Sequence, residues 1–165
     1  MQLAEIRPDL RFLDVRGNIA TRLSQLGRFD ALVVAAVALE RLGLDEQVVE
    51  VLDTSVMLPQ VGQGSLAVEC RIDDPATRSR LSSIDHPPTR VVVEAERDFL
   101  IELGGDCDLP AGAHAQLRDD GTLSVVGLLA HAADGRPWRV ERMAITGRPS
   151  DHPGRAVAQR LRARL

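Results

Sequence analysis

One thiol in an unusual setting offers the clearest chemistry in the chain. The segment 96–110 predicts a helix that ends at Leu103. Gly104 and Gly105 then predict a turn that leads to Cys107, because glycine accepts the positive φ that commonly ends a helix. A thiol presented on such a loop can act as a nucleophile and bind a ligand covalently. A lone cysteine is more often a small, inert, buried residue, and the spacing alone leaves that alternative open.

Arginine supplies a second kind of chemistry. The basic residues other than histidine number 20, and all of them are arginine. A guanidinium group binds a carboxylate in a fixed, bidentate geometry. Arg16 follows a predicted strand and Arg22 lies one to two helical turns further on, so both can point into one crevice. Arg22 and Arg41 also fit the solvated face of a helix, and spacing alone favours that alternative.

Composition excludes several classes of function. The chain has 165 residues, is 44% hydrophobic and 27% charged, and suits one domain or two small ones. A net charge of −4, with no basic block and 2% aromatic residues, argues against binding of nucleic acid. The longest apolar run, 31–39, is too short to span a membrane. Scattered histidines and the absence of a Cys-x-x-Cys motif argue against a metal site.

The first residues lack the basic-then-apolar pattern of a signal peptide, so the expected location is the cytoplasm. A disulfide between Cys70 and Cys107 is disfavoured in that compartment.

The N-terminal third alternates between strand and helix patterns. Runs 11–15 and 31–35 read as strands, and 18–26 and 36–42 read as helices, which is typical of an α/β fold. A short helical stretch is expected at 45–52, and a Gly-punctuated link then leads to a further strand at 65–71.

The rest of the chain predicts an α+β domain. We expect helices at 74–83, 89–103 and 153–165, strands at 113–118, 122–131 and 138–146, and hairpin turns at 119–121 and 134–135.

The segment around Cys107 resembles the cofactor-attachment motif of the hydroxymethylbilane synthase family, also called porphobilinogen deaminase. In that family the cysteine carries a dipyrromethane through a thioether bond. Asp106, Leu109 and Ala111 depart from the family pattern, and an acid beside the thiol is expected to slow thiolate attack. The matching residues are Glu96, Arg97, Phe99, Leu103, Gly105, Cys107, Pro110 and Gly112.

Three further segments, 14–23, 30–43 and 58–71, resemble the family in the same order, so the likeness covers essentially the whole chain. Porphobilinogen carries acetate and propionate groups. The resemblance therefore implies that Arg16, Arg22 and Arg41 hold carboxylates of the pyrrole chain. It also implies that Gln63 lies near the cofactor-facing cleft.

The resemblance implies a fold and a domain order. Residues 1–57 are expected to form part of an α/β domain that is periplasmic-binding-protein-like. Residues 58–74 would be a linker and a strand that returns to the family's first domain. Residues 75–165 would form the cofactor-carrying α+β domain, a three-stranded antiparallel sheet with helices.

The implied activity is a transferase of tetrapyrrole and heme biosynthesis. It joins four porphobilinogens into hydroxymethylbilane and releases ammonia, on the Cys107-bound primer. The family's N-terminal motifs, including its general-acid Asp, do not occur here, and Asp14, Asp30 and Asp73 do not occupy that motif. We therefore expect a truncated chain with no known catalytic residue, inactive unless a separate N-terminal half joins it.

Two other hypotheses stay open. The chain could be a degenerate relative that acts as a non-catalytic binding protein. It could also be a thiol-redox domain that uses Cys107, although no resolving cysteine lies nearby.

Overall fold

The computed structural model describes residues 1–105, 109–131 and 139–164. The chain divides into two compact units, one of residues 2–57 and one of residues 58–165, to which Met1 is also assigned.

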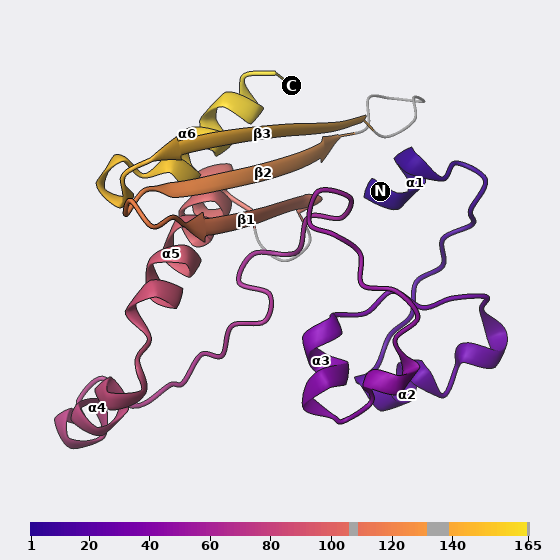
Figure 1. Ribbon diagram of the computed structural model, residues 1–165, viewed down its shortest axis with the longest axis horizontal. Coiled ribbons are helices and arrows are strands. Elements are labelled where there is room, and N and C mark those ends of the chain that lie inside the picture. Colours follow the sequence, from indigo (N-terminus) through magenta and orange to yellow (C-terminus); the bar gives the residue numbers. More distant parts are fainter. Residues whose placement is uncertain (106–108, 132–138, 165) are drawn as a thin grey trace. The chain divides into compact units, whose positions relative to one another are not determined.

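A three-stranded sheet forms the centre of unit 58–165 (Figure 1). Its strands are β1 (Ala111–Leu117), β2 (Leu123–His131) and β3 (Arg139–Gly147), antiparallel in the order β1-β2-β3. The β1–β2 turn is tight because the Arg118 N–H donates to the Thr122 carbonyl at 2.8 Å and Gly121 adopts φ +77. The Asp120 carboxylate accepts the Thr122 N–H at 3.0 Å and closes the turn locally.

Two helices cover one face of this sheet (Figure 1), namely α5 (Pro87–Leu103) and α6 (Pro153–Arg162). Gly127 lets them approach, because a Cβ there would lie 2.6 Å from the Phe99 ring and 2.5 Å from Val157. The core therefore lies between helices and sheet, and its largest fully buried residues are Phe99, Leu123, Leu161, Val125, Val157 and Pro153.

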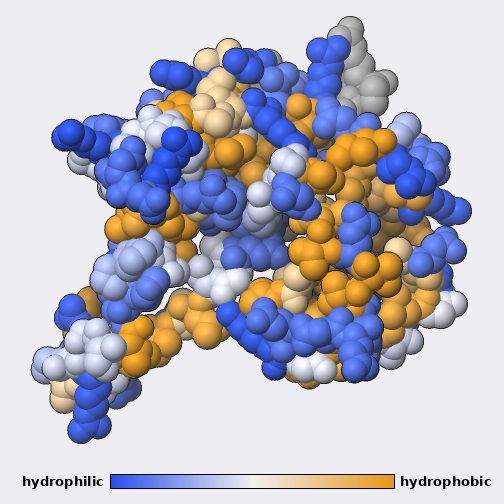
Figure 2. Space-filling view, in the orientation of Figure 1, coloured by the Kyte–Doolittle hydropathy of each residue, from blue (hydrophilic) through white to orange (hydrophobic). Residues whose placement is uncertain are grey.

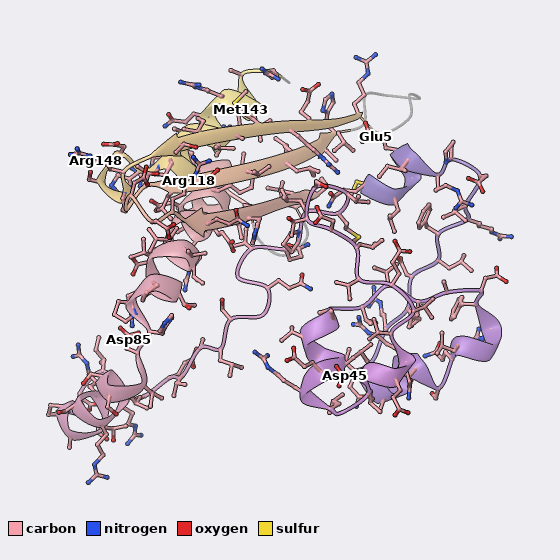
Figure 3. The ribbon with its side chains drawn as sticks, in the orientation of Figure 1. Glu5, Asp45, Asp85, Arg118, Met143 and Arg148 are labelled. Atoms are coloured by element: carbon pink, nitrogen blue, oxygen red, sulfur yellow. The ribbon has the colours of Figure 1, made fainter. Side chains whose placement is uncertain are left out.

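The beginning of α5 is held by polar contacts. Asp85 precedes the helix (Figure 3). Its carboxylate accepts hydrogen bonds from Arg90 Nε at 3.0 and 3.1 Å. The His86 ring accepts the Thr89 N–H, which is one of the amides that a helix leaves without an internal partner.

Unit 58–165 begins with an irregular segment. Leu58 is buried, and the Leu58 and Pro59 carbonyls lie against Gly112, where a Cβ would be 3.3 and 2.8 Å from their oxygens. Further along, Asp74 caps α4 (Pro75–Leu81) by accepting the Thr77 N–H at 2.9 Å, and the 3₁₀ turn η3 (Ser82–Ile84) follows.

Unit 2–57 contains short helices and loops. Its helices are α1 (Gln2–Ile6), α2 (Ile19–Leu23) and α3 (Ala36–Arg41), with 3₁₀ turns η1 (Leu26–Arg28) and η2 (Asp45–Gln47). Asn18 caps α2 as predicted, since its side chain accepts the Thr21 N–H at 2.9 Å. All of residues 2–57 are described, and Leu39 alone among them is buried.

Hydrophobic side chains are visible on the molecular surface (Figure 2). In unit 2–57 the exposed ones include Ile6, Leu13, Val33, Val49 and Val51. This unit buries little apolar surface of its own, so the hydrophobic effect stabilises it weakly.

The predicted fold class is confirmed: an N-terminal part that contains helices precedes a three-stranded antiparallel sheet with helices. The strands and helices of unit 58–165 begin and end within three residues of their predicted bounds wherever the structure describes them. The turn 134–135 and the predicted start of the third strand at Trp138 lie outside the described residues. The domain limits proposed from the sequence stay predictions.

Three strands predicted from apolar runs are wrong. Residues 11–15, 31–35 and 65–71 form no strand, and the helix expected at 45–52 shrinks to η2. A strand exists only when its backbone pairs with a neighbour, and the described residues place no such neighbour beside these runs. An apolar sequence pattern indicates that a segment tends to be buried, but it does not indicate which strand it pairs with.

Candidate functional site

The turn before Cys107 needs both of its glycines. Gly104 ends α5 in the left-handed region with φ +68, and its N–H donates to the Ile101 carbonyl at 2.9 Å. The Gly105 N–H donates to the Leu100 carbonyl at 3.3 Å. A Cβ on Gly105 would lie 2.5 Å from Leu109 Cδ2, so no larger residue fits there without movement.

The chain is also anchored just after Cys107. Leu109 packs against the hydrophobic core, and the Pro110 carbonyl accepts the Ala130 N–H at 2.8 Å. Residues 106–108, and with them Cys107, lie outside the described residues. The neighbours on both sides of this short segment are thus tied to helix α5 and strand β2.

The three predicted carboxylate-binding arginines all belong to unit 2–57. Arg16 is exposed, and Arg22 is half-buried in α2. Arg22 Nε donates to the Gly17 carbonyl at 2.8 Å, so its side chain folds back onto the loop that carries Arg16. Arg41 is exposed in the last turn of α3.

Gln63 lies in unit 58–165, in a segment that we call the Gln63 turn, residues 59–64. Gly62 has φ +70, and the Gln63 N–H donates to the Gln60 carbonyl at 3.1 Å. The Gln63 side chain is exposed, and its Oε1 accepts the Gln60 N–H at 3.2 Å. Val61 packs against the core and holds the turn on the unit.

A buried carboxylate, that of Glu96, fastens this turn to the sheet. Glu96 is 5% exposed on α5. Its Oε2 accepts the Gly62 N–H at 2.7 Å, and its Oε1 accepts the Ala115 N–H at 2.9 Å. His114 Nδ1 lies 3.7 Å from Oε1. Burial raises the pKa of Glu96, and the two N–H donors and the His114 ring partly offset this.

Sequence reasoning did not single out Glu96 as a site residue. Its position in the sequence could have identified it. Glu96 lies four residues after Val92 and three before Phe99, which places it on the inward face of α5. An acidic residue on that face needs hydrogen-bond donors from elsewhere in the fold.

A metal site finds no support in the described part of the chain, where no group of three His, Cys, Asp or Glu side chains is placed to hold an ion. Cys70 is exposed and carries a free thiol. Within the described ranges, no helix combines the length and apolar character that crossing a membrane requires.

Two family sequence models match the chain. One, described as "Porphobilinogen deaminase, dipyromethane cofactor binding domain", matches residues 1–79. The other, described as "Porphobilinogen deaminase, C-terminal domain", matches residues 91–163. The first match contains the three arginines and Gln63, and the second contains Cys107 and β1 to β3.

Curated relatives agree with these matches. A porphobilinogen deaminase of Pelobacter propionicus is 39% identical over 99% of this chain and 53% of its own length. Those of Roseiflexus castenholzii and Synechococcus elongatus are 43% and 41% identical over 97% and 98% of the chain, and 52% of their own lengths. The chain thus spans about half the length of the curated relatives it matches.

Proposed function

The chain belongs to the porphobilinogen deaminase family, and on that premise we propose that it is the C-terminal portion of a hydroxymethylbilane synthase. The proposed activity joins four porphobilinogens head to tail, forming one carbon–carbon bond and releasing one ammonia at each addition. The observation that carries the proposal is an identity of about 40% that extends over nearly the whole chain.

The residues fit a dipyrromethane by the chemistry of their donor set. We propose that the Cys107 thiol forms the thioether bond, and that Arg16, Arg22 and Arg41 bind acetate and propionate carboxylates. When bound, the primer would supply a pyrrole carbon to which porphobilinogen adds. Guanidinium groups suit this role because they stay charged at neutral pH and offer paired N–H donors.

Gln63 would face the cofactor from the Gln63 turn. Its exposed amide can donate and accept hydrogen bonds, as pyrrole N–H groups and carboxylates require. The general acid of the reaction is not assigned to a residue of this chain.

Substrate, partner and location are part of the same proposal. The substrate would be porphobilinogen, and the pathway that of tetrapyrroles and heme. A separate N-terminal half is the proposed protein partner, because the curated relatives are about twice as long as the matched region. The proposed location is the cytoplasm, where free thiols stay reduced.

Intact mass spectrometry tests the proposal. The chain, when produced in a host that is rich in porphobilinogen, should carry a pyrrolic adduct. This adduct should be absent from the Cys107→Ser variant. Cys70→Ser is the matched control and should keep the adduct, although the Cys70 thiol is free and exposed. An adduct on Cys70, or an unmodified chain under every condition, would contradict the assignment and favour a non-catalytic binding protein.

A further inference from the structure

One buried side chain joins three segments that are far apart in the sequence. Glu96 lies on α5, 34 residues from Gly62 and 19 residues from Ala115. Each of its two oxygens binds one backbone N–H, at 2.7 and 2.9 Å. The carboxylate therefore links the Gln63 turn and strand β1 to the same point of the helix.

Both amides need an acceptor of this kind. β1 is an edge strand of the sheet, and the Ala115 N–H is used by Glu96. An edge amide without a partner is exposed to pairing with other chains, and a buried one costs free energy. An ionised carboxylate is the stronger type of acceptor, and its two oxygens allow it to serve both amides at once.

Contacts made before Gly62 also hold the turn on the unit. Leu58 is buried, the Leu58 and Pro59 carbonyls lie against Gly112, and Val61 packs on the core. Gln63 directly follows Gly62, the residue whose backbone N–H binds Glu96. The Glu96 bond is thus a polar tie between the backbone at the tip of the turn and helix α5.

We propose that Glu96 is the positioning residue for Gln63, and that its carboxylate fixes the backbone from which the Gln63 amide projects. The titratable group that faces it is His114 of β1, whose Nδ1 is 3.7 Å away. The segment 58–64 contains no titratable side chain.

The importance of Gln63 for catalysis rests on the proposed function. The tie between Glu96 and the turn is a structural claim that does not depend on that function. An experiment that reads backbone amides therefore tests the tie alone. If this experiment shows no tie, the proposed thiol adduct on Cys107 can still be correct. If no adduct forms on Cys107, the tie between Glu96 and the turn can still be correct.

The test is NMR and amide exchange on the full chain. The amide protons of Gly62 and Ala115 should titrate with one common midpoint, because both bind one carboxyl group. In Glu96→Gln both titrations should vanish. Exchange of residues 62–64 should become about tenfold faster, as one lost hydrogen bond predicts, because the amide side chain keeps only one acceptor oxygen.

Glu94→Gln is the matched control, since Glu94 lies two residues away on α5 with a side chain that is 64% exposed. It should change neither the titration nor the exchange. His114→Gln should keep the common titration, which separates the carboxylate from the imidazole. The wild-type titration needs no variant, so it remains informative even if Glu96→Gln unfolds. Different midpoints at Gly62 and Ala115, or unchanged exchange at 62–64 in a folded Glu96→Gln, would overturn the proposal.

Discussion

At the residue scale, the burial of the Glu96 carboxyl group predicts that stability depends on pH. Burial raises its pKa above the ordinary 4.5 of the group. The folded-state pKa then exceeds the unfolded one, so the contribution to stability is full below the unfolded pKa. It is lost as pH rises through the folded pKa.

We therefore expect wild type to gain stability relative to Glu96→Gln as pH falls from neutrality towards 4.5. Urea denaturation of both chains at several pH values in this window measures the difference in the free energy of unfolding. The comparison removes the contribution of other titrating groups, because both chains share them. A difference that stays constant with pH would mean that the carboxylate titrates alike in both states.

At the element scale, the packing of α5 against α6 depends on a glycine. A Cβ on Gly154 would overlap the Ala95 carbonyl oxygen and lie 2.9 Å from the Ala95 carbonyl carbon. Backbone atoms cannot turn aside as a side chain can. The close approach of the two helices therefore requires glycine at this position.

Gly154→Ala should accordingly destabilise unit 58–165 by about 1–3 kcal/mol, the usual cost of overpacking. Thermal or urea denaturation followed by circular dichroism measures this change. Gly27→Ala is the control, since nothing lies within 4 Å of its added Cβ. We expect it to stay within about 0.5 kcal/mol of wild type. Equal stability of wild type and Gly154→Ala would show that the helices lie further apart.

At the scale of the whole molecule, the two units differ in how much they bury. Leu39 is the buried residue of 2–57, whereas unit 58–165 has a core that includes Phe99, Val125 and Leu161. Backbone hydrogen bonds without an apolar core open readily.

Hydrogen exchange should therefore be rapid across 2–57 and slow in α5 and the described strands. Mass spectrometry of peptides from the exchanged chain measures both regions in one sample, so each is the control for the other. Equal protection would show that residues 2–57 are stabilised by contacts outside their own unit, such as those of a dimer.

The proposed activity gives a further prediction for the whole molecule. Alone, the 165-residue chain should form no hydroxymethylbilane above background, because none of its acidic residues occupies the family's general-acid motif. Loss of such an acid typically costs about two to four orders of magnitude. Fluorescence of uroporphyrin after oxidation measures the product, with and without an added N-terminal half of a relative. Product from the chain alone would mean that one of its own carboxylates supplies the proton.

The sequence alone determined what depends on neighbouring residues. Strand alternation, the Asp-Gly turn at 120–121 and the αL glycine at Gly104 are local features, so the sheet and helices of unit 58–165 could be predicted. The Asn18 cap of α2 in unit 2–57 is local in the same way. Only the tertiary structure decided what depends on distant partners. The apolar runs 11–15, 31–35 and 65–71 form no strand, because pairing requires a neighbour that their own residues cannot specify. The spacing of Glu96 likewise places it on the inward face of α5, but only the fold decides that two backbone amides bind its carboxylate.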